Sequence, residues 1–285
     1  MLELRSVDET QVYSAFMEAF ADYQMDASGT TEERLLLRMK KNAVDFEASV
    51  GAYSEDRLVG FTMVGIDTVD DVCTAFDAGT GIVPDFRKQG LAKRMFDHAL
   101  PGLRDRGVRR FLLEVLQGNE PAIKAYRKSG FETVRELRCF VADAEPLRAL
   151  LADAKLRIEP IDAPQFREVT GEANWTPSFE NRFTAVDAIP DHVTIHGALR
   201  DGECLGAVAY SPTLNWLLSL LVRREARRQG VGRALVRHLA HQLPEAATRL
   251  TVLNVDGSDD GMQRFLTDLG FTSLVDQYEM ARALD

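Results

Sequence analysis

One motif occurs twice in this chain of 285 residues, and the repeat constrains the fold more than any other feature. Residues 87–92 read Arg-Lys-Gln-Gly-Leu-Ala, and residues 227–232 read Arg-Arg-Gln-Gly-Val-Gly. The correspondence continues without a gap to Gly130-Phe131 and Gly270-Phe271. Because one hydrophobic core usually serves about 100–200 residues, a repeat of this length predicts two related domains.

Each copy places basic and polar residues before a glycine, between an apolar run and an amphipathic helical pattern. Backbone N–H groups at such a helix N-terminus form a nest that binds anionic phosphates. Gly90 and Gly230 have no Cβ, so the backbone can approach a phosphate closely. The repeat therefore predicts a phosphate-binding cradle in each half of the chain.

Composition excludes some classes of function. The net charge of −10 argues against a nucleic-acid partner, which normally requires a basic face. The sequence contains no apolar run of about 20 residues and no signal-peptide pattern, so we expect a cytoplasmic protein without a membrane span. Cys73, Cys139 and Cys204 are an odd number without metal-site spacing, and we expect reduced thiols.

Strand-like and helix-like patterns follow one another in the same order in both halves. In the first half we expect strands at 2–5, 48–53, 58–64, 75–83, 111–115 and 131–140, and helices around 12–20, 30–39, 90–102 and 120–129. In the second half we expect strands at 156–162, 196–199, 205–210, 216–222, 251–255 and 277–283, with a helix over 231–243. This order predicts an α/β (α+β) fold with a mixed, largely antiparallel sheet in each domain. The predicted domains are 1–143 and 155–285, joined by a linker helix at 144–154.

The first half continues from its cradle through a helix and a strand to Asn119-x-x-Ala122-x-x-x-Tyr126 and Gly130-Phe131. This ordered set resembles the GNAT acyl-CoA-dependent N-acetyltransferases. The resemblance implies two tandem GNAT-like domains, each with a V-shaped opening between two splayed central strands. It also implies acetyl-CoA as the cofactor, and an acetyl group moved to a primary amine of a small molecule or peptide. Acyl-chain length stays open.

The resemblance also implies which residues hold acetyl-CoA. Backbone groups of the cradle would bind the diphosphate, and the preceding strand and Asn119 would bind the pantetheine arm. The implied cofactor-binding residues are Gly81, Ile82, Val83, Arg87, Lys88, Gln89, Gly90, Leu91, Ala92, Asn119 and Tyr126.

Two residues are implied as catalytic. Tyr126 has the family's general-acid position, and a tyrosine with its ordinary pKa near 10 carries a proton at neutral pH. Glu114 is our candidate base, because an alkylammonium must lose a proton before it attacks, and a partly buried carboxylate has a raised pKa. Ribosomal-protein N-terminal acetyltransferases of this family show the same Leu-Glu-Val before the tyrosine. A strand-end glutamate that pairs with Arg109 or Arg110 is the alternative.

The second copy lacks these groups. At the positions of Glu114, Asn119 and Tyr126 it has Asn254, Asp259 and Leu266. We therefore predict that the N-terminal domain catalyses and that the C-terminal domain is a degenerate copy. Its candidate second coenzyme A site comprises Val222, Arg227, Arg228, Gln229, Gly230, Val231 and Gly232.

Two other functions remain open, and a third is disfavoured. Catalysis could reside in the C-terminal half, as in mycothiol synthases, or the protein could be an acyl-CoA-binding regulatory module without turnover. A Rossmann dehydrogenase is disfavoured, because neither cradle contains Gly-x-Gly-x-x-Gly. The sequence does not decide between a monomer and a homodimer.

The acceptor is the least constrained part of the prediction. Several aspartates in segments that usually border the acceptor groove favour a cationic amine: Asp22, Asp26, Asp67, Asp70 and Asp71. An aromatic loop could cover either the acceptor or a domain interface: Trp175, Pro177, Phe179 and Asn181.

The histidines indicate no metal site. His98 and His238 are equivalent in the repeat, which a polar helix face explains. His192 and His196 alternate on a strand without a third ligand, so we expect no metal.

Overall fold

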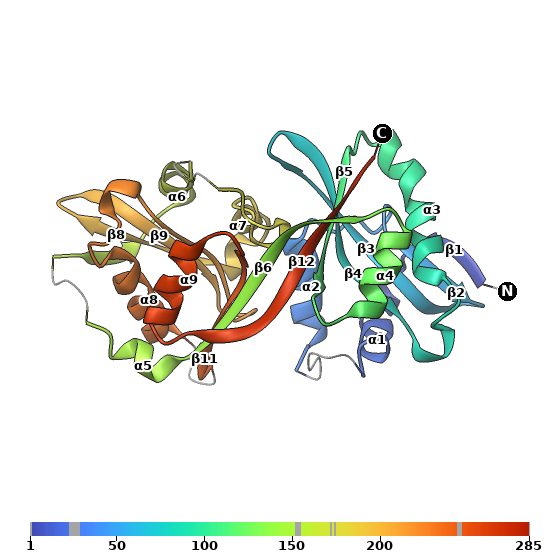
Figure 1. The fold of residues 1–285 in the computed structure, drawn as a ribbon, viewed down its shortest axis with the longest axis horizontal. Helices are drawn as coiled ribbons and strands as arrows, with labels where there is room; N and C mark the ends of the chain where they lie inside the picture. The colour runs from blue at the N-terminus through green and yellow to red at the C-terminus, as the bar shows by residue number, and fades with distance from the viewer. Residues whose placement is uncertain are drawn as a thin grey trace. The chain divides into compact units, whose positions relative to one another are not determined.

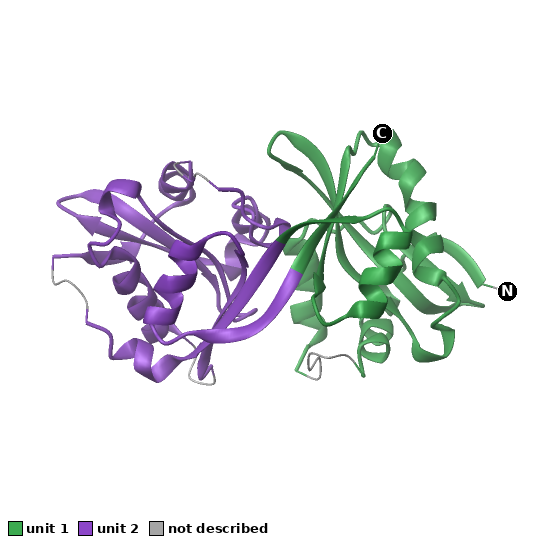
Figure 2. Cartoon of the chain, viewed as in Figure 1, with its two compact units in different colours: residues 1–135, 278–285 green, residues 136–277 purple. Residues whose placement is uncertain are grey.

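The computed structural model describes residues 2–22, 29–151, 155–171, 173, 175–243 and 247–284. These residues form two compact units, coloured separately in Figure 2. Unit 1 contains residues 1–135 and 278–285, and unit 2 contains residues 136–277.

Unit 1 has the strand order β1-β2-β3-β4-β5-β12 (Figure 1). Its strands are β1 (Leu2–Ser6), β2 (Val50–Ser54), β3 (Arg57–Val69), β4 (Val72–Ile82), β5 (Arg110–Leu116) and the end of β12 (Thr272–Ala283). Its helices are α1 (Glu9–Ala19), α2 (Glu32–Lys41), η1 (Pro84–Phe86), α3 (Leu91–Asp105) and α4 (Glu120–Lys128). Strands β1 to β4 pair antiparallel, whereas β4 and β5 pair parallel.

Unit 2 repeats this arrangement with the order β6-β11-β10-β9-β8-β7. Its strands are β6 (Glu132–Asp143), β7 (Arg157–Pro160), β8 (Thr194–Arg200), β9 (Glu203–Ser211), β10 (Trp216–Val222) and β11 (Arg249–Asp256). Its helices are α5 (Ala144–Arg148), α6 (Ala163–Thr170), η2 (Phe179–Asn181), α7 (Ala185–Ala188), η3 (Pro190–His192), η4 (Arg224–Ala226), α8 (Val231–Gln242) and α9 (Asp260–Asp268). Here β10 and β11 are the parallel pair. The predicted mixed, largely antiparallel sheet is confirmed in both units.

The compact units differ from the domain limits expected at residues 143 and 155, because the two halves exchange their last strands. The end of β6 pairs with β11 inside unit 2. The end of β12 supplies Met280 and Leu284 to the hydrophobic core of unit 1, and the Leu284 N–H donates to the Arg109 carbonyl at 2.9 Å. A repeat read from the sequence shows which segments correspond, but not which copy each last strand completes.

Two expected helix boundaries are wrong. Helix α3 continues through Pro101 to Asp105 instead of ending near residue 102, because its last turn buries Leu103. The expected linker helix is shorter, since α5 covers only Ala144–Arg148 and residues 152–154 lie outside the described part of the chain. The predicted start of α2 is confirmed: Thr31 is its N-cap and accepts a hydrogen bond from the Arg34 N–H.

Helices cover both faces of the sheet in unit 1. On one face α3 and α4 pack over Leu113 and Val115 of β5. On the other face α1 and α2 pack over Phe61 and Met63 of β3. Because side chains alternate along a strand, Glu114 lies on the face opposite to Leu113 and Val115.

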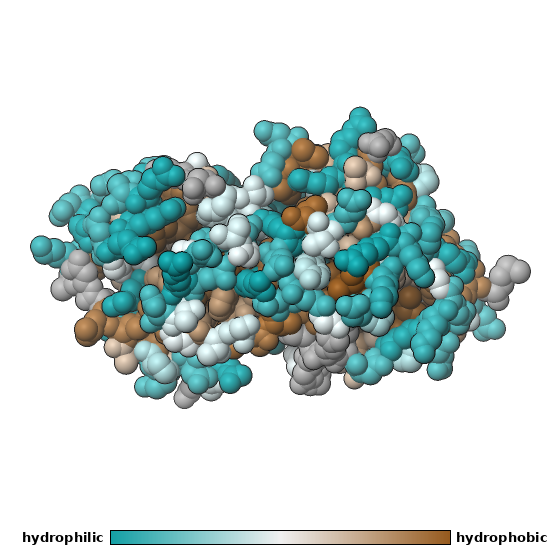
Figure 3. Space-filling view, viewed as in Figure 1, coloured by the Kyte–Doolittle hydropathy of each residue, from teal (hydrophilic) through white to brown (hydrophobic). Residues whose placement is uncertain are grey.

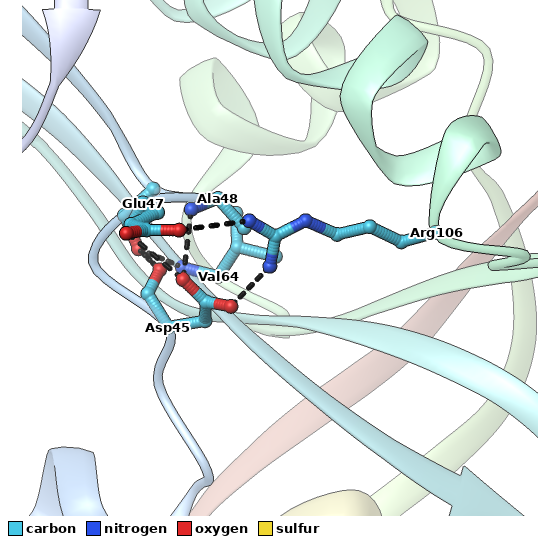
Figure 4. A network of polar contacts seen from close by, with 6 residues as sticks. Asp45, Glu47, Ala48, Val64 and Arg106 are labelled. Atoms are coloured by element: carbon cyan, nitrogen blue, oxygen red, sulfur yellow. Dashed lines mark hydrogen bonds and ion pairs between the residues drawn. The ribbon is translucent and has the colours of Figure 1, made fainter.

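A polar network connects the C-terminal end of α3 to the loop before β2 (Figure 4). The Asp45 carboxylate accepts the Glu47 and Ala48 N–H groups and forms an ion pair with Arg106. The Asp45 N–H donates to the Val64 carbonyl at 2.9 Å. Burial opposes ionisation of Asp45, but these bonds outweigh it and hold the pKa of this carboxyl below its ordinary value. The network fixes β3 beside α3.

The face of the molecule in Figure 3 carries mainly hydrophilic residues with scattered apolar ones. The large apolar side chains that are exposed among the described residues are Val134, Leu151, Trp175 and Leu274. Within that part of the chain, no helix combines the length and the apolar character that crossing a membrane requires.

Two histidine rings are in contact inside unit 2. His196 of β8 and His238 of α8 have ring centroids 4.5 Å apart. Burial lowers the pKa of both imidazoles, and for His238 the nearby His196 and His241 lower it further. Neutral rings can pack at this distance, whereas two imidazolium ions would repel each other. His98, the equivalent of His238 in unit 1, is exposed.

We predict that unit 2 loses stability in mild acid. A histidine whose folded pKa is lowered stabilises the fold above its ordinary pKa of 6.5, and this contribution is lost as the pH falls through the folded pKa. His238→Leu should therefore reduce the drop in melting temperature between pH 7.5 and pH 5.5. His98→Leu is the matched control and should leave the drop unchanged. Equal pH dependence in wild type and His238→Leu would refute the prediction.

Candidate active site

The central strands of unit 1 separate partway along their length. Their parallel pairing runs from Thr74–Arg110 to Asp77–Leu113 and ends there. At the same point β4 has a bulge at Ala78, where its register with β3 shifts. A Cβ added to Gly79 would meet no atom within 4 Å, so there is open space beside the separation. We call this opening between β4 and β5 the fork of unit 1.

The predicted cradle lies directly beyond the end of β4. Lys88 and Gly90 have positive φ values of 62° and 69°, and α3 begins at Leu91. This backbone turns successive N–H groups toward one side, as an anion-binding nest does. A Cβ added to Gly90 would meet no protein atom, so the protein leaves the space above the cradle open. Gln89 lies in the turn before α3, and its Nε2 donates to the Asp85 carbonyl at 3.5 Å, whereas Ala92 lies in the first turn of α3.

Arg87 lies in the cradle but its guanidinium binds protein groups. Its Nε donates to the Ile82 carbonyl at 3.0 Å, and its terminal nitrogens donate to both Asp22 oxygens at 2.7 Å. A further bond reaches the Ala19 carbonyl at the end of α1. The Arg87 bonds hold the pKa of Asp22 below its ordinary value. Arg87 thus fixes the cradle to the strand end and to α1.

The strand before the cradle offers a main-chain donor to the fork at Ile82. The Val83 N–H is used within the sheet, since it donates to the Val59 carbonyl at 3.0 Å. Hydrogen-bonding groups alternate along a strand, so the Ile82 N–H points away from β3 toward the fork. A Cβ on Gly81 would come within 2.5 Å of Phe61, so glycine is required there for packing.

Tyr126 of α4 lies on the face of the fork that α3 and α4 cover. Its ring packs edge-on against Phe96, with centroids 5.8 Å apart, and the residue is 9% exposed. The Tyr126 hydroxyl lies 3.5 Å from Oδ2 of Asp77. Asn119 caps α4, since its Oδ1 accepts the Ala122 N–H at 3.2 Å. Both residues are therefore placed by the start and the buried face of one helix.

Asp77 is a residue that the sequence analysis missed. It is 7% exposed and accepts bonds from the Gly79 N–H at 3.1 Å and from the Thr80 hydroxyl at 2.9 Å. Burial raises the pKa of Asp77 to about 6, although the bonds from Thr80, Gly79 and Tyr126 oppose the rise. A comparison of position 77 with Leu217, its counterpart in the repeat, would have singled it out.

Glu114 is half-buried on β5, immediately after the last residue that pairs with β4. It lies on the face that α1 and α2 cover, so Glu114 and Tyr126 approach the fork from opposite faces of the sheet. The alternative partner Arg110 binds elsewhere, since its guanidinium donates to the Thr74 hydroxyl and the Val69 carbonyl.

A small pocket lies on the Glu114 face, between the two helices α1 and α2 and the bulge of β4. Its lining is mainly apolar: Phe16, Leu35, Arg38, Met39, Asn42, Phe61, Met63, Ala78 and Gly79. Of the aspartates expected to border the acceptor, Asp22 is paired with Arg87, and Asp26 lies outside the described residues. Asp70 and Asp71 form the turn before β4, at the opposite end of that strand from the cradle.

The fork of unit 2 is filled by its own side chains. Parallel pairing ends at Leu217–Val252. The Asn181 amide donates to the Leu253 carbonyl at 2.7 Å, and its oxygen accepts the Trp216 indole N–H at 3.1 Å. The aromatic loop at residues 175–181 thus reaches into this fork.

Further side-chain contacts surround the fork of unit 2. Asn254 has a positive φ of 59° and bonds to Ser178 and Gln277. A Cβ on Gly232 would lie 3.0 Å from Phe265, so this ring already covers the start of α8.

The second cradle nevertheless keeps its backbone geometry. Arg228 and Gly230 have φ values of 62° and 81°, and α8 begins at Val231. Arg227 Nε donates to the Val222 carbonyl at 3.2 Å, as Arg87 does to Ile82. Gln229 is engaged by Arg200 at 2.9 Å and by the Glu225 carbonyl at 2.7 Å.

We predict that Asp77→Asn stabilises the fold at neutral and alkaline pH. A carboxyl whose folded pKa is raised from 3.8 to about 6 is penalised when it ionises, by about 3 kcal/mol above pH 6. This penalty shrinks as the pH falls toward 4. Urea unfolding should show a gain of about 1–3 kcal/mol at pH 8 and a clearly smaller gain at pH 4.5. A gain of equal size at both pH values would contradict the prediction.

Comparison with known proteins gives matches in both halves of the chain. A family model described as the acetyltransferase (GNAT) family matches residues 10–131 and 156–271. The chain is 30% identical over 92 residues to a ribosomal protein bS18-alanine N-acetyltransferase of Salmonella typhimurium, which covers 32% of this chain and 60% of that relative. It is 46% identical over 54 residues to a mycothiol acetyltransferase of Saccharomonospora viridis, 19% of this chain and 18% of that relative. The chain therefore spans less than two thirds of these relatives.

Solved structures resemble the whole chain. A tandem GNAT protein from the clavulanic acid biosynthesis pathway matches 100% of this chain with a TM-score of 0.74 and 16% identity, over 99% of its own length. A GCN5-related N-acetyltransferase from Sphaerobacter thermophilus matches 99% of this chain with a TM-score of 0.73 and 15% identity, over 96% of its own length. At these identities the likeness shows the tandem fold alone. Because the family model matches each half of the chain separately, the protein belongs to the acetyltransferase (GNAT) family.

Proposed function

We propose that the protein is an acetyl-CoA-dependent N-acetyltransferase whose catalytic site is the fork of unit 1. One observation carries the proposal: an open fork, a nest-shaped cradle, Tyr126 and Glu114 meet in unit 1, whereas protein side chains fill the equivalent fork of unit 2. The acetyltransferase names of the relatives support the same reaction class.

The residues of unit 1 suit acetyl-CoA. The N–H groups from Lys88 to Ala92 would bind the diphosphate at the positive end of α3. The Ile82 N–H would bind the pantetheine arm or the carbonyl oxygen, where an N–H group stabilises developing negative charge. When bound, acetyl-CoA supplies an activated acyl thioester.

Glu114 and Tyr126 divide the proton transfers between the two faces of the sheet. An alkylammonium with a pKa near 10.4 is almost entirely protonated at pH 7, so Glu114 would take a proton from it on the α1–α2 face. Tyr126 would donate its hydroxyl proton to the departing sulfur on the α3–α4 face.

The acceptor would be a primary amine of a small molecule or peptide, bound on the Glu114 face. The residues that surround Ala78 on this face are mainly apolar, which favours an acceptor with an apolar part next to its amine. The expected preference for a cationic amine gains no support from Asp22, because its carboxylate is already paired with Arg87.

Catalysis by unit 2 is the second candidate, favoured by the intact backbone of its cradle and by the mycothiol acetyltransferase match. The filled fork and the leucine at position 266 count against it. An acyl-CoA-binding module without turnover would bind acetyl-CoA but release no thiol with any amine.

We predict that Tyr126→Phe lowers kcat about 100-fold with little change in the KM for acetyl-CoA, because the variant loses only the proton donor. Glu114→Gln should lower kcat by a similar factor at pH 7. Thiol release from acetyl-CoA over a panel of primary amines measures both. Leu266→Phe, at the equivalent position of unit 2, is the control and should keep wild-type kcat. Full activity of Tyr126→Phe would overturn the assignment.

A second prediction separates the two cradles. Gly90→Ala and Gly230→Ala place a Cβ at the same left-handed position, and each should cost about 1 kcal/mol of stability. Gly90→Ala should raise the KM for acetyl-CoA about tenfold, which corresponds to about 1.4 kcal/mol of lost binding. Gly230→Ala should leave it unchanged. The reverse pattern would place the productive cofactor site in unit 2.

A further inference from the structure

Asp77 places a carboxyl directly behind the Tyr126 hydroxyl. The two oxygens lie 3.5 Å apart, at the outer limit of a hydrogen bond, and such contacts often tighten only when the substrate is bound. The Thr80 hydroxyl lies within 3.0 Å of both Asp77 oxygens, and the Gly79 N–H fixes one of them. Asp77 therefore has one fixed orientation, with Oδ2 toward the tyrosine.

The repeat provides an internal comparison for this group. Unit 2 has leucine at each equivalent position: Leu217 for Asp77, Leu220 for Thr80 and Leu266 for Tyr126. Leu217 and Leu266 are buried there, so the same fold packs well without any polar group at these places. A buried carboxyl costs stability, whereas leucine does not. Packing therefore does not account for Asp77, and it occurs in the copy that has the tyrosine.

We propose that Asp77 is the positioning residue for Tyr126, directing its hydroxyl proton toward the fork and replacing that proton after transfer. This inference rests on the proposed function of unit 1. An ionised Asp77 accepts the phenol hydrogen bond and turns the proton away from the fork. A protonated Asp77 donates its own O–H to Tyr126 Oη, so the phenol proton points into the fork.

The proton transfers balance in two steps. The Tyr126 O–H bond breaks as an S–H bond forms on the leaving thiolate, which leaves a phenolate at Tyr126. The Asp77 O–H bond then breaks and its proton bonds to the phenolate oxygen, because a carboxylic acid is a far stronger acid than a phenol. Asp77 remains as a carboxylate and recovers a proton from water.

The surroundings of Asp77 permit this role near neutral pH. Among the residues that the structure describes, Tyr126 of α4 is the titratable group within hydrogen-bond reach of Asp77. The register partners of Asp77 on β3 and β5 are Val64 and Leu113, and its further hydrogen-bond partners on β4 are Gly79 and Thr80, all uncharged. On α3, the uncharged Phe96 packs against the Tyr126 ring. Glu114, the nearest carboxyl along β5, lies on the opposite face of the sheet. A cofactor that fills the fork displaces water and further favours the protonated carboxyl.

The pH dependence of kcat tests the proposal. In wild type, kcat should fall about tenfold per pH unit once Asp77 ionises. Asp77→Asn has the same size and donates permanently to Tyr126, but cannot pass a proton on. It should lower kcat about tenfold at pH 6, keep the KM for acetyl-CoA within twofold, and remove the alkaline fall. A merely structural role would leave the shape of the profile unchanged, and that result would overturn the proposal.

A double variant and a titration complete the test. The kcat of Asp77→Asn combined with Tyr126→Phe should be within twofold of the kcat of Tyr126→Phe alone, whereas multiplied losses would refute the coupling.

Independently of turnover, carbon-13 NMR of labelled aspartate carboxyls should show a higher pKa for Asp77 in Tyr126→Phe, since the tyrosine bond lowers the pKa in wild type. An unchanged titration would disprove the contact. If wild type shows that contact but acetylates no amine, the proposed function fails instead.

Discussion

Everything at the candidate site depends on two parallel strands that separate partway along their length. Peptide groups on separated strands lose their ladder partners and must find others, since buried backbone groups are almost always paired. Unit 2 satisfies this requirement internally, because the Asn181 side chain bonds the Leu253 carbonyl. In unit 1 the space beside Gly79 stays open. The same architecture thus leaves space beside Gly79 in one half, whereas in the other half the Asn181 side chain bonds to both separated strands.

The exchange of last strands makes the two halves depend on each other. Unit 1 takes Met280 and Leu284 from the C-terminal strand into its core, while the end of β6 pairs with β11 in unit 2. Neither half of the sequence therefore contains all the strands of its own sheet. Since domains generally fold during synthesis from the N-terminus, unit 1 cannot complete its sheet until the whole chain is present.

Arginine in the repeated motif holds the backbone in place. Arg87 bonds the Ile82 carbonyl and Arg227 bonds the Val222 carbonyl, so each ties the cradle to the preceding strand. The proposed anion site rests on the positive φ values at Lys88 and Gly90, because such a backbone turns successive N–H groups toward one side. In both copies of the motif, the first arginine thus bonds to the protein backbone.

The sequence by itself determined the tandem repeat, the mixed sheet, the two cradles, and the loss of Glu114 and Tyr126 from the second copy. These features depend on local patterns, because periodicity, glycine positions and the spacing of a repeat are carried by neighbouring residues. Only the tertiary structure decided which strand completes which unit, that Arg87 binds Asp22, and that Asn181 fills the second fork. It also brought Asp77 to Tyr126, a contact 49 residues apart in the chain. Such contacts depend on how distant segments pack, and no local pattern of residues encodes them.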